Sequence, residues 1–150
     1  MKKLLLLLLI PVLVYSCKKS DAEQARIDKQ ILLKYIADSS LVVDSTASGL
    51  YYAIADSGSG VSPSSGSYIT VYYKGYYTDG TIFDQNPAGT PINGFLGGFI
   101  PGWIEGLPKI KKGGKIKLLV PSSLAYGNAG YASIPPNTVL IFDVELVDVR

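Results

Sequence analysis

The feature that most constrains the fold is an alternation of apolar and polar residues near the C-terminus. From Leu140 to Leu146 every second residue is apolar, and the residues between them include Asp143 and Glu145. Successive side chains of a β-strand point to opposite faces, so this spacing predicts a strand that buries one face. The content of glycine (16), tyrosine (11) and proline (9) suits twisted strands joined by tight turns. We therefore predict an antiparallel, β-rich domain.

The first 16 residues have the form of an export leader. Lys2 and Lys3 precede a hydrophobic run from Leu4 to Val14. Crossing the roughly 30 Å hydrocarbon region of a bilayer takes about 20 apolar residues, so this run is too short to span it and predicts a cleaved signal peptide, residues 1–16. The remaining chain has room for one domain of ordinary size.

Cys17 is the only cysteine of the chain. The sequence Val14-Tyr15-Ser16-Cys17 resembles the bacterial lipobox, in which the leader is cut before the cysteine and the cysteine is acylated. Several acyl chains anchor a protein stably, because each buried CH₂ contributes about 0.8 kcal/mol. The alternative is an ordinary leader with an incidental cysteine, but an exposed unpaired thiol is a liability in a secreted protein. We expect lipidation at Cys17.

The residue after the cysteine bears on location. Lys18 is not the aspartate that commonly marks inner-membrane retention. The expected location is therefore the cell envelope, lipid-anchored at the outer membrane, with a periplasmic and a surface-facing orientation both open.

An amphipathic helix is predicted after the anchor. Ser20 followed three residues later by Glu23 has the form of a capping box. Apolar residues then recur at helical spacing as far as about Asp38: Ile27, Ile31 and Tyr35, with Leu32 and Ile36 beside them. Residues 17–48 are expected to form a lipid-anchored helix and linker, and residues 49–150 the folded domain.

Within residues 49–150 the expected order is strand, hairpin, short helix, strand, long loop, strand. Asp79-Gly80 is a dipeptide typical of a hairpin turn. Prolines near both ends limit the helix to about two turns. The predicted elements are Leu50–Ile54, a hairpin formed by Tyr68–Tyr77 and Thr81–Phe83, the helix within Ile100–Leu107, Ile116–Val120 and the C-terminal strand.

Composition excludes several kinds of chemistry. The chain has no histidine, which removes histidine general bases, Ser-His and Cys-His nucleophile pairs and histidine-containing zinc sites, and one cysteine cannot form a thiolate cluster. No metal or organic cofactor is implied. Without Lys2 and Lys3 the mature part has 12 basic residues against 12 acidic ones. A nucleic-acid partner is not expected, because such proteins carry a basic surplus.

Several motifs in fixed order carry a family resemblance. They are Val71–Gly75, Gly80–Asp84, Ile100–Gly106, Ala125–Gly127, Ile134–Asn137 and Phe142–Leu146. Together they resemble the FKBP (immunophilin) family of peptidyl-prolyl cis/trans isomerases across about residues 49–149. The resemblance implies an α+β fold: a twisted antiparallel sheet wrapped around one short helix, with an aromatic pocket between them.

The resemblance also implies roles for individual residues. Trp103 corresponds to the pocket floor, and the walls correspond to Tyr73, Phe83, Phe99 and Phe142. The backbone N–H of Ile100 and the hydroxyl of Tyr126 would each donate to a substrate carbonyl. Asp84 would lie at the rim, and Ile134 would close the pocket.

Two positions depart from the family pattern. Ile92 or Gly94 stands where many members have an aromatic wall residue, and Tyr131 stands where some carry a histidine. Taken singly, each aromatic residue has a plainer interpretation as core, and Asp84 as a turn residue. Their joint order favours the pocket.

An activity of this kind fits the composition. Rotation about a peptide bond has a barrier of about 18–20 kcal/mol, and X-Pro bonds populate both isomers. A dry aromatic cavity with fixed donors can favour the twisted amide without covalent chemistry. Proline-containing polypeptides are the implied substrates, with macrolide immunosuppressant binding as a further family property. The alternatives are a non-catalytic chaperone or adaptor using the same pocket, and a structural lipoprotein without a cavity.

Overall fold

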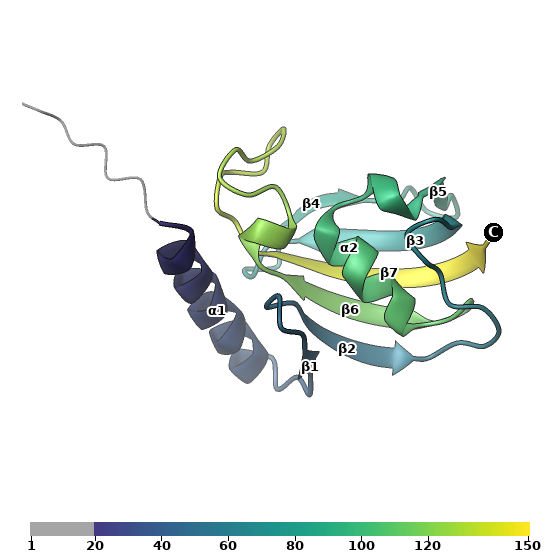
Figure 1. The fold of residues 1–150 in the computed structure, drawn as a ribbon, viewed down its shortest axis with the longest axis horizontal. Coiled ribbons are helices and arrows are strands. Elements are labelled where there is room, and N and C mark those ends of the chain that lie inside the picture. Colours follow the sequence, from purple (N-terminus) through teal and green to yellow (C-terminus); the bar gives the residue numbers. More distant parts are fainter. Residues whose placement is uncertain (1–19) are drawn as a thin grey trace, which may run out of the picture.

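The structure is a computed structural model that describes residues 20–150 (Figure 1). It confirms the predicted fold class, an antiparallel sheet packed on one short helix. The strands are β1 (Asp44–Ser45), β2 (Tyr51–Asp56), β3 (Tyr68–Tyr76), β4 (Ile82–Gln85), β5 (Ile92–Phe95), β6 (Lys115–Val120) and β7 (Leu140–Val149). The helices are α1 (Asp21–Asp38) and α2 (Pro101–Gly106), with 3₁₀ turns at Leu96–Gly98, Leu107–Lys109 and Ser122–Leu124. The predicted leader and Cys17 lie outside the described residues.

The strand order across the sheet is β1-β2-β6-β7-β3-β4, and β5 pairs with the other half of the same edge of β3. The predicted hairpin joins β3 to β4: Tyr77 donates to the carbonyl of Thr81 at 2.9 Å, and Gly80 takes a φ of +88°. The connection expected over residues 39–48 contains β1, which adds a two-residue edge to β2.

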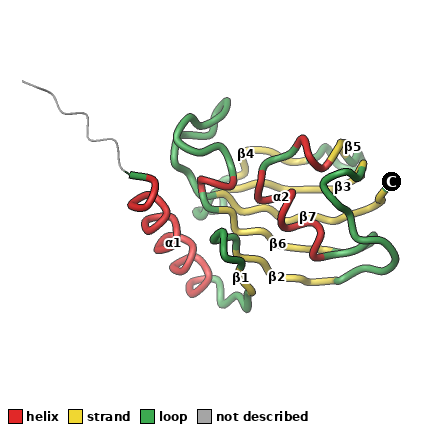
Figure 2. The backbone as a smooth tube through the Cα atoms, viewed as in Figure 1, coloured by secondary structure: helices red, strands yellow, loops and turns green. Residues whose placement is uncertain are grey.

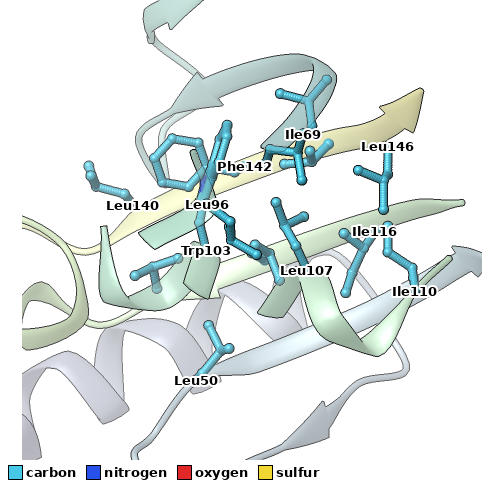
Figure 3. Packing of buried hydrophobic residues seen from close by; sticks show 14 of the residues in the cluster. Leu50, Ile69, Leu96, Trp103, Leu107, Ile110, Ile116, Leu140, Phe142 and Leu146 are labelled. Atoms are coloured by element: carbon cyan, nitrogen blue, oxygen red, sulfur yellow. The ribbon is translucent and has the colours of Figure 1, made fainter. Parts of the chain in front are cut away.

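The alternation in β7 places its apolar residues against α2. Leu140, Phe142 and Leu146 are buried there, and Leu118 of β6 pairs with Phe142 in register. Figure 3 shows Leu140, Phe142 and Leu146 gathered with Trp103 and Leu107 between the sheet and α2. The sequence predicted that β7 buries one face, but near its start the strand is buried on both faces. Ile141 is fully buried on the opposite face, in a second cluster with Leu32 of α1.

Two glycines let α2 lie close to the sheet. A Cβ at Gly102 would approach Val120 Cγ1 to 2.6 Å, and one at Gly106 would approach Leu118 Cδ2 to 2.5 Å. Real Cβ atoms essentially never make such contacts. The short helix therefore presents glycine to β6 and turns Trp103 and Leu107 into the core.

Helix α1 packs beside the end of the sheet (Figures 1 and 2). Its predicted cap is present, since the Glu23 N–H donates to Ser20 Oγ at 3.2 Å. The inward face differs from the predicted stripe: Asp28 and Leu32 are buried, whereas Ile31 is 37 % exposed. On this inward face Asp28 accepts hydrogen bonds from Ser122, and Leu32 packs in the second hydrophobic cluster. Within residues 20–150, no helix has the length and apolar character needed to cross a membrane.

Candidate active site

An aromatic cavity of about 390 Å³ lies between α2 and the inner face of the sheet. Ten of the eleven site residues predicted from the sequence line it: Tyr73, Phe83, Asp84, Ile92, Phe99, Ile100, Trp103, Tyr126, Tyr131 and Phe142. Gly98 also lines it and was not predicted, because a glycine has no side chain that marks a pocket. The residues come from β3, β4, β5, α2, β7 and the loop after β6, so the fold brings distant segments to one place.

Trp103 lies at the centre of the aromatic rings. It is 3 % exposed, and the ring of Phe99 stacks on it at 5.0 Å between centroids and 25° between planes. Tyr73 and Phe142 present their edges to it at 5.4 Å and 5.5 Å. Edge-on and offset contacts are the preferred aromatic arrangements, worth about 0.5–1.5 kcal/mol each beyond burial. Trp103 is thus held as a rigid floor.

Phe83 forms the outer wall. Its ring meets the edge of Phe142 at 5.7 Å and lies 5.2 Å from Tyr77. In the sheet, Gly75 pairs with both Asp84 and Phe142. A Cβ at Gly75 would approach Phe83 Cζ to 2.6 Å. The ring of Phe83 therefore occupies space that exists because position 75 has no side chain.

The sequence left open whether Ile92 or Gly94 stands in place of the family's aromatic wall residue, and the structure distinguishes the two. Ile92 lines the cavity, whereas Gly94 lies behind Phe99, where a Cβ would be 2.7 Å from Phe99 Cζ. The glycine leaves room for the ring that stacks on Trp103. Aliphatic Ile92 and aromatic Phe99 together form this side of the cavity.

The polar side-chain groups of the cavity lining are one carboxylate, the three phenols of Tyr73, Tyr126 and Tyr131, and the indole N–H of Trp103. The hydroxyl of Tyr73 donates to Asp84 Oδ2 at 2.5 Å. The partner of Asp84 is thus a residue that the sequence analysis assigned to a wall of the pocket. Burial, followed by the hydrogen bond and the charge of Asp84, raises the pKa of Tyr73 well above its usual range. Burial first, and then Tyr131 and Asp84, raise the pKa of Tyr126. The phenols of Tyr73 and Tyr126 are protonated at neutral pH and are able to donate hydrogen bonds.

A backbone donor stands at the start of α2. Ile100 is the N-cap, with extended φ and ψ of −62° and 150°, and its carbonyl accepts from Trp103 N at 2.9 Å. The N–H of an N-cap residue is outside the hydrogen-bond ladder of its helix. The N–H of Ile100 is thus available to a carbonyl group, which fits the predicted role.

Ile134 differs from its predicted place. It is 7 % exposed, belongs to the core and is absent from the cavity lining. Ile134 and Tyr131 exchange two backbone hydrogen bonds of 2.8 Å and 3.0 Å. Tyr131 in turn stacks on Tyr126 at 5.1 Å with 14° between the planes. Ile134 therefore supports the rim of the cavity from behind.

The aromatic cavity is smaller than two other hollows among the described residues. One, of about 650 Å³, lies between α1 and the loop after β6 and is lined mainly by polar and small residues. The other, of about 550 Å³, is open and lies on the outer face of the sheet, where Lys74 and Lys117 pair with Asp143. Neither of these hollows is lined by the packed aromatic rings around Trp103, so we assign the candidate site to the aromatic cavity.

The fold is thus an antiparallel sheet packed on one short helix, with a cavity between them that is lined by aromatic side chains and hydrogen-bonding groups. The family model for FKBP-type peptidyl-prolyl cis-trans isomerases matches residues 60–147. The chain belongs to the FKBP-type peptidyl-prolyl cis-trans isomerase family.

Individual relatives agree. The FKBP-type peptidyl-prolyl cis-trans isomerase FkpA of Escherichia coli K12 is 50 % identical over 109 residues, which are 72 % of this chain and 40 % of the relative. The crystal structure of FkpA from E. coli superimposes with a TM-score of 0.76 at 44 % identity, over 86 % of this chain and 60 % of that one. A peptidyl-prolyl cis-trans isomerase from Pseudomonas syringae pv. tomato has a TM-score of 0.74 at 29 % identity, over 89 % and 98 %.

The chain spans about two fifths of the length of the FkpA sequence that it matches. Its N-terminal helix α1 precedes the region matched by the family model.

Proposed function

We propose that the chain is a peptidyl-prolyl cis/trans isomerase that accelerates X-Pro isomerisation during the folding of envelope or secreted proteins. The observation that carries this proposal is the cavity floored by Trp103, with aromatic walls and neutral phenols at its rim. Uncatalysed X-Pro isomerisation takes tens of seconds, so folding in the envelope gains from such an activity.

The proposed mechanism is non-covalent. The proline ring lies over Trp103, and the amide before it twists in a site from which water is excluded. The carbonyl of a planar amide is hydrogen-bonded to water more strongly than that of a twisted amide, so an apolar site favours the transition state. The N–H of Ile100 and the hydroxyl of Tyr126 hold flanking carbonyls, and Asp84 fixes Tyr73 through their hydrogen bond.

The test is a protease-coupled isomerisation assay with proline peptides that differ in the preceding residue. The variant Phe83→Ala/Asp84→Ala removes a wall and the carboxylate, and Val42→Ala, at a position that is 92 % exposed, is the matched control. We expect the double variant to lose activity and the control to keep it. A folded protein without activity on any peptide would refute the isomerase proposal.

The alternative of a non-catalytic chaperone or adaptor predicts a different outcome of the same experiment. Tyr131 at the rim is 64 % exposed, which gives an extended client an aromatic contact outside the cavity. Binding of an unfolded, proline-containing client without acceleration of isomerisation would favour this alternative. Macrolide immunosuppressants are proposed as ligands of the same cavity, and Trp103 fluorescence reports their binding.

We further propose that Cys17 is acylated and holds the domain in the cell envelope at the outer membrane. In this proposal residues 1–16 are the leader, residues 17–48 the anchored helix and linker, and residues 49–150 the isomerase domain. The lipobox-like residues before Cys17 support it. Radiolabelled palmitate incorporation should be lost in Cys17→Ser. Fractionation with protease shaving of intact cells then distinguishes a surface-facing from a periplasmic domain.

A further inference from the structure

One carboxylate of α1 is fully buried. Asp28 is 1 % exposed and points to the segment that follows β6. Its Oδ2 accepts hydrogen bonds from the N–H of Ser122 at 2.8 Å and from Ser122 Oγ at 2.6 Å. Its Oδ1 accepts from Gln24 Nε2 at 2.7 Å. All three donor groups, two of Ser122 and one of Gln24, are uncharged.

Ser122 in turn holds the backbone on both sides of Tyr126. Its carbonyl accepts from the N–H of Ala125 at 3.0 Å and from the N–H of Gly127 at 2.8 Å. The residues immediately before and after Tyr126 are therefore bound to one oxygen atom. The Ser122 residue that fixes them is itself bound to α1 through Asp28, so a hydrogen-bond path of two residues joins α1 to Tyr126.

Packing alone does not account for a carboxylate at this position. C-terminal to Asp28 the inward face of α1 is apolar, with Leu32 fully buried and Ile36 beside it, whereas the turn before Asp28 carries Gln24. Burying a carboxylate costs free energy that an apolar side chain would not cost, and neutral donors recover only part of it. Directional hydrogen bonds are what Asp28 adds, and they are made to the segment that carries Tyr126.

We propose that Asp28 is a positioning residue for the isomerase site: through Ser122 it fixes Tyr126 at the rim of the cavity. This inference rests on the proposed function. Its consequence is that α1, which precedes the region matched by the family model, contributes to the geometry of the site as well as linking it to the proposed anchor.

The first measurement is amide hydrogen exchange of the full chain. The variants are Asp28→Ala, the conservative Asp28→Asn, and the matched control Asp38→Ala at the exposed end of the same helix. We expect exchange across residues 123–130 to rise about tenfold in Asp28→Ala, less in Asp28→Asn and not in the control, with β7 unchanged. An equal rise in β7, or no rise in the loop, would overturn the proposal.

The second measurement is a double-mutant cycle in the isomerisation assay. If Asp28 acts through Tyr126, Asp28→Ala lowers kcat/KM about threefold to tenfold in the parent and has no further effect in a Tyr126→Phe background. Equal losses in the two backgrounds would overturn it. An inactive parent would refute the proposed function, while the exchange measurement would still decide whether Asp28 orders the loop. If Asp28→Ala does not fold, Asp28→Asn and Ser122→Ala replace it in both measurements.

Discussion

Substitution of Gly75 by alanine tests whether the cavity depends on a missing side chain. Gly75 lies in β3 opposite Phe142, and its φ is outside the left-handed region, so alanine is compatible with its backbone. The new Cβ would lie 2.6 Å from Phe83 Cζ and 3.0 Å from Phe142 Cε1. Both rings line the cavity, but Phe142 is 4 % exposed and held against Trp103, whereas Phe83 is only partly buried. Phe83 is the ring that must move.

The size of the movement follows from the same contact. Ordinary van der Waals contact begins at 3.4 Å, so the ring of Phe83 must retreat by about 0.8 Å from its present 2.6 Å. Overpacking of this kind costs about 1–3 kcal/mol. We expect the free energy of unfolding, measured in urea, to fall by that amount. We also expect kcat/KM to fall, because the displaced ring of Phe83 would occupy part of the cavity. Gly66→Ala, where the nearest atom is 3.7 Å away, should change neither quantity.

A compensating substitution identifies the ring. Leucine at position 83 is shorter than phenylalanine, so Gly75→Ala/Phe83→Leu should recover part of the stability lost in Gly75→Ala, while activity stays low because the wall is gone. Unchanged stability in Gly75→Ala would refute the close approach. A stability loss that Phe83→Leu does not relieve would refute Phe83 as the partner.

Three further predictions concern the helix, the phenols and the second wall. Leu32→Ala should cost about 2–5 kcal/mol of unfolding free energy, against little for exposed Ile31→Ala, with coincident transitions by circular dichroism and Trp103 fluorescence if α1 unfolds with the sheet. Because folding raises the pKa of Tyr73, this residue contributes to the unfolding free energy in full below about pH 10, and the contribution is lost as pH rises toward the pKa of the folded state. Tyr73→Phe should therefore flatten the alkaline decline in unfolding free energy. An unchanged slope would contradict this prediction. Gly94→Ala should displace Phe99 from Trp103, seen as a change in tryptophan fluorescence that Gly66→Ala does not produce.

Local patterns in the sequence predicted the elements well. The alternation in β7 and the Asp79-Gly80 turn depend only on residues that are neighbours in the chain. The period of the strand and the dihedral preference of the turn can therefore be predicted from the sequence alone. Trp103 and Tyr73 were found through ordered motifs, because each motif carries unusual residues at fixed spacing. The sequence therefore located most of the cavity lining.

Contacts between segments that are distant in the sequence could not be predicted. Asp28 and Ser122 are 94 positions apart, and a serine after a strand is unremarkable until a buried carboxylate is seen to bind it. For the same reason the helical stripe was centred on Ile31 instead of Leu32: hydrophobic spacing gives the period of a helix, but the contacts that bury Asp28 and Leu32 are made with distant segments. Ile134 was placed in the lining by its motif, and only the backbone bridge to Tyr131 reveals its supporting position.

The cavity draws its shape from the scaffold more than from its own side chains. Gly75 and Gly94 open the space in which Phe83 and Phe99 lie, and both glycines are fixed by pairing with neighbouring strands. Trp103 is carried by a helix that approaches the sheet through glycines of its own. A non-covalent catalyst of amide rotation has no proton to transfer, so its rate depends on how well such a cavity keeps its shape. Substitutions at these glycines should therefore affect the proposed activity as strongly as substitutions of the rings themselves.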